Sequence, residues 1–330
     1  MNQMNIAFIG CGNHMFNFLY PRLRKLPVTT AGVCDKDPAK LSRFSSCYAV
    51  SKTYTDYREM IQETRPDAVV CAAEAKVHYE VARYCLLRQI PVYVEKVPCE
   101  TAAQAEELAE LSAKSGSIVM AGFNRRYATG YMMAKDVVSR KEFGQPAVFY
   151  MKFHASPYRS VDYFVFNHII HLLDTACYIL GKLDNISVLH RVFTPQKGSY
   201  VVNFTTASGT LGTLHSACML ATPFPMEYLD IAGTGGQEVT VDNLQDVRYN
   251  RSGPERDQIH GLPLQDNGDC LSWNASNGHA QGVDYMGFDA QLAEFYGAVS
   301  GGKPIASGIE SCVNTMIALE RVMELTRRAE

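Results

Sequence analysis

The chain has 330 residues, of which 47% are hydrophobic and 20% are charged. This length fits two domains better than one core, and the composition is that of a globular protein. The formal net charge is −3, so the overall charge does not favour nucleic acid or an anionic membrane as a partner. Any anionic ligand would have to be held by local groups.

The start of the chain and its cysteines indicate a compartment. The first predicted strand begins at Asn5, with no basic stretch and apolar run before it, so we expect no signal peptide. No apolar segment is expected to be long enough to cross a bilayer. The ten cysteines are scattered singly without a C-x-x-C pair, which favours reduced thiols over disulfides or a zinc site. We therefore predict a cytoplasmic protein without a bound metal.

Short apolar runs alternate with helical patterns through the first 124 residues. Strands are predicted at 5–9, 30–34, 67–72, 91–94 and 117–121, with a weaker one near 48–50. Helices are predicted at 13–25, 76–88 and 101–115, and Thr101 and Gly116 supply the start and stop chemistry of the last one. This alternation predicts an α/β domain over residues 1–124, with a doubly wound parallel sheet.

The pattern changes after residue 124. A helix at 127–140 precedes alternating strand-like stretches at 147–155, 186–193, 200–206, 210–219, 227–232 and 238–241. A strong helix at 167–180 interrupts them, and 251–287 is predicted to be a long polar loop. Helices at 288–300 and 309–328 close the chain, with Ser307 and Glu310 as a capping box for the second.

These elements predict a second domain over residues 125–330. It would be an α+β domain with a large, mostly antiparallel sheet. The last helices could pack back on the N-terminal domain.

The first candidate site is a glycine turn directly after the first strand. Gly10 permits a tight turn, and Gly12 lets a phosphate approach backbone amides at the start of a helix that continues through Asn13 and His14. The third glycine of the dinucleotide fingerprint is Met15 here. The position of the turn in an alternating α/β region predicts a Rossmann-type dinucleotide site, and an ordinary glycine turn is the alternative.

Two further candidates follow the second and fourth predicted strands. Asp35 can accept hydrogen bonds from an adenine-ribose diol and would repel a 2′-phosphate, which favours NAD over NADP. Lys36 beside it keeps NADP as an alternative, and a plain surface aspartate is the competing interpretation of Asp35. Glu95 and Lys96 lie at the carboxyl end of a strand, where open α/β sheets bind ligands, although such a pair taken alone is more often a solvated surface pair. Lys96 could donate to a substrate oxygen and oppose charge build-up as hydride leaves the carbon.

The helix at 167–180 carries a third group. Asn167, His171 and Asp174 are four and three residues apart, so they share one helix face. His171 is the natural proton carrier near neutral pH. His168 is a lesser candidate, and a metal bound by the two histidines lacks an obvious third ligand. Each histidine taken alone could instead be structural.

Together these residues resemble the Gfo/Idh/MocA family of sugar, cyclitol and sugar-nucleotide oxidoreductases. The resemblance covers nearly the whole chain, and His78 is placed like the histidine of the family's T-P-N-x-x-H pattern. The matching segments are IGCGN at 9–13, CDKDPAK at 34–40, EKVPCET at 95–101, GFNRRY at 122–127, FNHIIHLLDTACYILG at 166–181 and FDAQLAEFYGAVSGGKPI from 288.

The resemblance implies an NAD(P)-dependent dehydrogenase or reductase that acts on a CH–OH group of a sugar or cyclitol. It also implies a homodimer or homotetramer built through the open face of the C-terminal sheet. The predicted catalytic residues are Lys96, His171 and Asn167. The predicted cofactor-binding residues are Gly10, Gly12, Asn13, His14, Asp35, Lys36, Ala73, His78, Glu95 and Lys96. The predicted substrate-binding residues are Arg126, His154, Tyr158, Arg159, Asn167 and Asp174.

The sequence departs from the family pattern at three places, one of which is Ile169 and Ile170 in place of the family's small-residue segment before the histidine. Val97 stands where the family's E-K-P signature has proline, and Pro98 follows it. Asn167 stands where the family commonly has aspartate, and an amide cannot accept a proton at neutral pH. Two alternatives therefore stay open: a non-catalytic cofactor sensor of the same fold, and redox-neutral glycoside cleavage that uses bound NAD as a transient hydride acceptor.

Overall fold

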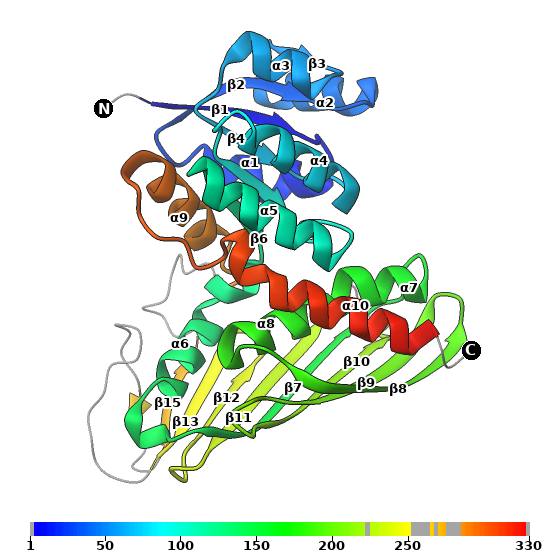
Figure 1. Cartoon of the computed structure of the whole chain (residues 1–330), viewed down its shortest axis with the longest axis vertical. Coiled ribbons are helices and arrows are strands. Elements are labelled where there is room, and N and C mark those ends of the chain that lie inside the picture. Colours follow the sequence, from blue (N-terminus) through cyan, green and yellow to red (C-terminus); the bar gives the residue numbers. More distant parts are fainter. Residues whose placement is uncertain (1–2, 222–224, 252–264, 267–269, 275–284, 328–330) are drawn as a thin grey trace. The chain divides into compact units, whose positions relative to one another are not determined.

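The computed structural model describes residues 3–221, 225–251, 265–266, 270–274 and 285–327 (Figure 1). The chain divides into two compact units. The first unit comprises Met1–Phe123 and Phe288–Val313, and the second comprises Asn124–Gly287 and Asn314–Glu330. Along the chain, the segment Phe288–Val313 therefore belongs again to the first unit, after the residues of the second unit have intervened.

The first unit contains a six-stranded sheet in which every neighbouring pair is parallel. The strands are β1 (Met4–Ile9), β2 (Val28–Cys34), β3 (Thr53–Tyr54), β4 (Ala68–Cys71), β5 (Val92–Glu95) and β6 (Val119–Gly122). Their order, β3-β2-β1-β4-β5-β6, reverses direction between β1 and β4, which is the switch point of a doubly wound fold. The predicted parallel sheet is confirmed.

The first unit also contains the helices between these strands and two helical segments from the C-terminal part of the chain. They are η1 (Met15–Leu19, a π-helical turn), α1 (Tyr20–Leu23), α2 (Pro38–Tyr48), α3 (Tyr57–Thr64), α4 (Ala75–Leu86), α5 (Ala102–Ser115), α9 (Phe288–Gly301) and η5 (Ile309–Cys312). The weak strand predicted near 48–50 is wrong. Asp37 caps a helix that buries Leu41 and Phe44 and continues to Tyr48, so the next strand begins only at Thr53.

The predicted capping is confirmed for α5 and is wrong for the last helical segment. The Thr101 hydroxyl accepts the Gln104 N–H at 3.2 Å in a full capping box, and Gly116 ends α5 with φ of 67°. The capping box predicted for Ser307 and Glu310 is wrong, because Gly308 is the N-cap of η5 without a side-chain cap. Ser307 is buried and its carbonyl accepts the Ala121 N–H beside β6.

The second unit is built on a nine-stranded sheet. Its strands are β7 (Pro146–Ala155), β8 (Asp184–Thr194), β9 (Lys197–Thr205), β10 (Leu211–Cys218), β11 (Met226–Gly233), β12 (Glu238–Asp242), β13 (Asp246–Asn250), β14 (Gln265–Asp266) and β15 (Cys270–Asn274). The order is β14-β15-β13-β12-β11-β7-β10-β9-β8, and only β7 and β10 pair in parallel. The predicted, mostly antiparallel sheet is confirmed.

The long loop predicted at 251–287 is wrong in part. Cys270–Asn274 forms strand β15 against β13, and Leu271 and Trp273 alternate into the core. The polar residues around this short run hid its period of two. Residues 252–264, 267–269 and 275–284 of the predicted loop lie outside the described residues.

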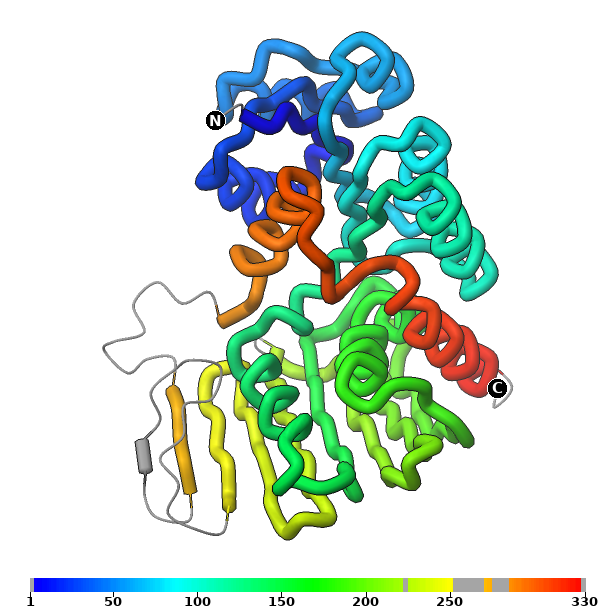
Figure 2. Tube along the Cα trace, turned by 60° about the vertical axis from the view of Figure 1, so that its left-hand side comes forward, coloured from blue at the N-terminus to red at the C-terminus, as the bar shows by residue number. Residues whose placement is uncertain are grey.

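Helices cover one face of this sheet (Figures 1 and 2). They are η2 (Asn124–Tyr127), α6 (Thr129–Val138), η3 (Lys141–Phe143), α7 (Val161–Phe164), η4 (Val165–Ile169, a second π-helical turn), α8 (Ile170–Leu180) and α10 (Val313–Arg327). In β7 the odd-numbered residues from Phe149 to Phe153 are buried, while Val148 on the other face is 49% exposed. Among the described helices we find none over that other face.

The continuous helical stretch Val161–Leu180 is long and apolar enough to cross a membrane by length and composition. The expectation that no segment reaches this length is therefore wrong. Within the described residues it is the one such helix, and 67% of its apolar window is buried inside the fold. Burial of this kind is what a core helix of a globular unit shows.

A buried ion pair joins η2, α8 and α10. The Arg126 guanidinium donates from Nε to Asp174 Oδ2 at 3.0 Å and from Nη2 to Oδ1 at 2.6 Å, and both side chains are 1% exposed. The Thr315 hydroxyl donates to the same Oδ1 at 3.0 Å. Arg126 and Asp174 were predicted to bind substrate. Because they are sealed in the core and bind each other, we assign them to the stability of the second unit.

Asp174→Asn should strongly destabilise the second unit. The substitution leaves a buried guanidinium without its counter-charge, which costs about 3–5 kcal/mol. The double change Arg126→Met with Asp174→Leu removes both charges and should recover most of that loss. Urea unfolding would measure both effects, with exposed Asp242→Asn as a control expected within about 0.5 kcal/mol of wild type. An unchanged midpoint for Asp174→Asn would contradict the assignment.

Candidate active site

The glycine turn after β1 has the geometry of a ligand-facing loop. Gly10 has φ of 87°, and a Cβ there would lie 2.1 Å from the Ala72 carbonyl oxygen, so only glycine fits. A Cβ at Gly12 would meet no protein atom within 4 Å. The fold itself therefore leaves space at Gly12, as expected where a dinucleotide approaches the backbone. Met15, at the third fingerprint position, is buried at the start of the helix.

Asp35 braces this turn. Its carboxylate accepts the Cys11 N–H at 2.7 Å and the Asp37 N–H at 2.9 Å. A carboxylate offers about four acceptor positions, so these two bonds leave capacity for a ribose diol. The predicted acceptor is thus held at the rim of the turn, while Lys36 beside it is exposed.

Arg43 on α2 was missed by sequence reasoning. Its Nη1 donates to Asn13 Oδ1 at 2.9 Å, and its guanidinium lies 4.0 Å from the centre of the Phe16 ring. Arg43 and Asn13 are 30 positions apart in the chain, so the sequence gave no signal for this contact. The contact adds a positive charge beside the turn, where an anionic ligand would be favoured.

The buried carboxylate of Glu95 connects His14, in the glycine turn, to the backbone of Lys96. Glu95 Oε1 accepts the Tyr93 hydroxyl at 2.7 Å and lies 3.2 Å from His14 Nε2, and Oε2 accepts the Lys96 N–H at 3.2 Å. Burial alone would raise the pKa of the Glu95 carboxyl, but His14, Tyr93 and Lys96 together bring it below its usual value. A Cβ at Gly122 would lie 2.7 Å from both the carboxylate and the Tyr93 hydroxyl, so glycine makes room for them.

His78 holds the other side of the Lys96 segment. Its Nδ1 donates to the Val97 carbonyl and its Nε2 accepts the Ala73 N–H, both at 2.8 Å. The peptide between Lys96 and Val97 is cis. His78 and Ala73 were predicted to contact the cofactor. Because the imidazole is fully buried and the two groups bind each other, we assign them to positioning the segment that carries Lys96.

The two histidines of the 167–180 helix have different surroundings. His168 Nε2 lies 3.2 Å from the Phe153 carbonyl, which can only accept, so Nε2 carries the hydrogen. Its Nδ1 lies 3.1 Å from the Tyr158 hydroxyl, so both ring nitrogens of His168 are engaged in the core. His171, which is 7% exposed, is the better candidate for proton transfer.

Three predicted substrate residues lie around this helix. Asn167 Nδ2 donates to the Tyr163 carbonyl at 3.2 Å, one turn earlier. The Arg159 guanidinium lies 3.5 Å from the centre of the Tyr163 ring. Tyr158 is tied to His168, and burial raises the pKa of its hydroxyl to about 12, so it stays a donor. These contacts bring Tyr158, Arg159 and Asn167 together.

His154 does not join this group. Phe153 contacts the rings of both His168 and His171, so the next residue along β7 points to the opposite face of the sheet. There His154 meets His215 of β10 with ring centres 5.1 Å apart. Burial, with His215 and Lys152, lowers the pKa of His154. The prediction that His154 lies near the same cleft as His171 is therefore wrong.

Arg125 is a second residue that sequence reasoning missed. Its guanidinium pairs with Glu227 of β11 in the core, and the Tyr131 hydroxyl donates to Glu227 Oε2 at 3.1 Å. Arg125 also lies over the Phe153 ring at 4.9 Å.

Among the described residues, no group of three or more histidine, cysteine or acidic side chains is placed to hold a metal ion.

The stability of the first unit should depend on the charge of His78. Burial lowers the pKa of His78 from 6.5 to about 4, so the unfolded chain takes up this proton first on acidification. The contribution of neutral His78 is complete above pH 6.5 and is lost as the pH falls to 4, by roughly 3 kcal/mol. Denaturant unfolding from pH 7 to 4 should show a shallower pH dependence for His78→Gln than for wild type. Parallel curves would contradict this prediction.

Comparisons with known proteins agree with this arrangement. Residues 4–123 match the model of the Gfo/Idh/MocA oxidoreductase family, described as an NAD-binding Rossmann fold. An inositol 2-dehydrogenase of Salmonella paratyphi B is 30% identical over 189 residues, which cover 54% of this chain and 55% of that protein. A D-apiose dehydrogenase of Rhizobium rhizogenes is 22% identical over 84% of this chain and 83% of its own length. The chain spans about half the length of the inositol dehydrogenases it matches.

Solved structures share the whole architecture. A dehydrogenase from Chromobacterium violaceum superposes with a TM-score of 0.83 at 18% identity, covering 98% of this chain and 95% of that one. An oxidoreductase from Agrobacterium radiobacter, crystallised with NAD+, L-tartaric acid and magnesium, has a TM-score of 0.79 at 17% identity over 99% and 97% of the two chains. The predicted fold class is confirmed, and NAD as the predicted cofactor agrees with the family description. Residues 4–123 are thus similar to the NAD-binding Rossmann domain of the Gfo/Idh/MocA oxidoreductases.

Proposed function

We propose that this chain is an NAD-dependent dehydrogenase that interconverts a secondary alcohol and a ketone of a sugar or cyclitol. The observation that carries the proposal is the glycine turn, where Gly12 faces open space and Asp35 is held at the rim. The dehydrogenases named among the relatives act on inositol and D-apiose, which supports a polyhydroxylated substrate.

Each proposed catalytic group has a separate role. A bound nicotinamide would supply the carbon that accepts or returns a hydride. Lys96 donates a hydrogen bond to the reacting oxygen, and its positive ammonium stabilises the negative charge that develops on that oxygen. His171 takes the hydroxyl proton, or returns it in the reductive direction. Asn167 hydrogen-bonds a neighbouring hydroxyl, which an amide can do without taking up a proton.

The support for these roles lies within each unit. Lys96 follows β5 at the carboxyl edge of the parallel sheet and is held between Glu95 and the His78 contact. Because both ring nitrogens of His168 are engaged by Tyr158 and Phe153, His171 is the proposed proton carrier of its helix. Tyr158 and Arg159 are proposed substrate contacts.

We further propose that the chain forms a homodimer or homotetramer through the open face of the nine-stranded sheet. Val148, Leu211 and Met226 are 49%, 64% and 45% exposed there, and large apolar side chains of this kind favour association. The cytoplasmic location stays a prediction from the sequence.

Lys96→Met and His171→Ala should each abolish most turnover while NAD binding is kept. General acid–base groups contribute about 10²–10⁴-fold to rate, so kcat should fall by at least about a hundredfold. Steady-state assays with a panel of polyols would measure kcat, and calorimetry would measure NAD affinity. Exposed Lys114→Met is the matched control for the loss of a lysine. Normal turnover in both variants would end the assignment.

The two alternatives give different results in the same assays. A cofactor sensor would bind NAD tightly without turnover of any polyol, and Asn167 is the feature that favours it. Redox-neutral glycoside cleavage would give a product without net oxidation, from a cofactor that never leaves. A nicotinamide absorbance signal that grows with added polyol supports the dehydrogenase over both.

Asp35→Ser should change the choice of cofactor. Removing the carboxylate deletes acceptors for the ribose diol and the repulsion of a 2′-phosphate. The affinity for NAD should fall by about tenfold or more, and the ratio of NADP to NAD affinity should rise. Calorimetric titration with both dinucleotides would measure this ratio, and an unchanged ratio would show that Asp35 only braces the turn.

A further inference from the structure

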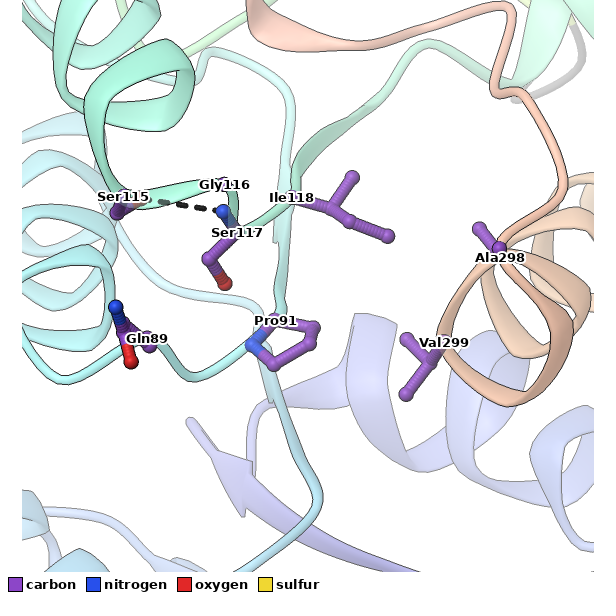
Figure 3. Close-up of a pocket in the computed structure, with 9 residues that line it drawn as sticks. Gln89, Pro91, Ser115, Gly116, Ser117, Ile118, Ala298 and Val299 are labelled. Atoms are coloured by element: carbon purple, nitrogen blue, oxygen red, sulfur yellow. Dashed lines mark hydrogen bonds between the residues drawn. The ribbon is translucent and has the colours of Figure 1, made fainter.

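The first unit has a pocket of about 430 Å³ at the edge of the sheet opposite to the glycine turn. Pro91 and Ile118, which precede β5 and β6, form its floor, and Figure 3 shows Ala298 and Val299 of α9 facing them. Lys96 lies at the other end of β5, and the four residues of that strand separate it from Pro91 by roughly 16 Å. The pocket is therefore distinct from the proposed active site.

Ser117 gives this pocket an unused polar group. The residue is 7% exposed, and its Oγ has no hydrogen-bond partner among the described residues. Its neighbours are already engaged, since Ser112 donates to the Ser117 carbonyl at 2.7 Å and Ser115 Oγ accepts the Ser117 N–H at 3.2 Å. Figure 3 shows the hydroxyl directed between Gln89 and Pro91. A buried hydroxyl without a partner costs free energy, so a ligand that binds it is favoured.

Three helices end at the pocket. Gln89 follows α4, Ser115 is the last residue of α5, and Gly302 follows α9. Helix C-termini present backbone carbonyls with a partial negative charge, which favour hydrogen-bond donors and disfavour anions. The ligand should therefore carry several donors.

The lining also limits the charge and shape of the ligand. None of the nine lining residues is charged, so an ionised ligand would find no counter-charge. The basic residues of the adjoining hollow are engaged elsewhere, with Arg88 stacked 3.6 Å from the centre of the Tyr84 ring and Lys114 paired with Glu110. Pro91, Ile118 and Val299 offer an apolar surface for C–H groups.

We propose that this pocket is a second binding site, for an uncharged polyol of monosaccharide or cyclitol size. Such a ligand donates hydroxyls to the helix carbonyls, bonds Ser117 Oγ and the Gln89 amide, and lays its C–H face on Pro91 and Ile118. The volume is within the range of small-molecule sites. The site does not depend on the dehydrogenase activity proposed above.

The test is calorimetric titration of the full chain with myo-inositol and with D-glucose, without added dinucleotide. Wild type should bind at least one probe saturably, and His171→Ala should bind it equally well, which separates this site from the proposed active site. Ser117→Ala should weaken binding by about tenfold, the loss of one hydrogen bond. Val299→Trp should fill the pocket and abolish binding, whereas Ile317→Trp on the exposed face of α10 should not.

A second measurement guards against a misfolded variant. Crystals soaked with the bound probe should show it in contact with Ser117 Oγ and Gln89. No saturable binding by wild type up to about 0.1 M, or equal binding by folded Val299→Trp, would overturn the proposal. So would crystals that show only an ordered water on Ser117.

Discussion

The parallel register of β1, β4 and β5 is the constraint on which the candidate site of the first unit depends. Ile9 pairs with Cys71, and Cys71 pairs with Val94, so the three strands end at one level. The turns that follow them must then share a small space. Gly10 approaches the Ala72 carbonyl so closely that a side chain would clash, and His78 connects the Ala73 amide to the Val97 carbonyl. Lys96 is positioned by backbone contacts of this kind.

Burial of polar groups at this edge explains several residue choices at once. Glu95 loses water on folding and needs Tyr93, His14 and the Lys96 amide to offset that loss. The space for Glu95 and Tyr93 exists only because residue 122 lacks a Cβ. Gly122 of β6 thus makes room for Tyr93 and Glu95 of β5, and Glu95 in turn holds the backbone of Lys96.

The second unit shows how neighbouring residues of the same type can have different environments. Arg125 and Arg126 are adjacent, yet Arg125 pairs with Glu227 on the sheet and Arg126 pairs with Asp174 on α8. Successive residues of a short helical turn point in different directions, so each guanidinium finds its own carboxylate. His168 and His171 also differ, because Tyr158 and Phe153 contact both ring nitrogens of His168, whereas the His171 ring centre lies 5.9 Å from that of Phe153.

The sequence by itself determined the two kinds of sheet, the two ends of α5 and the glycine turn, because these depend on hydrophobic period, caps and glycine conformations that are local to the chain. Asp35 and Lys96 could also be selected, since residues at the carboxyl ends of parallel strands share one edge. Only the tertiary structure decided which polar residues are buried and bound to other protein groups. His78, Arg126, Asp174 and His154 looked functional in the sequence, but their partners or sheet faces are set by how the chain folds. A pairing such as Asp174 with Arg126 and Thr315 has no local signature, because its stabilisation appears only when all three groups lose water together.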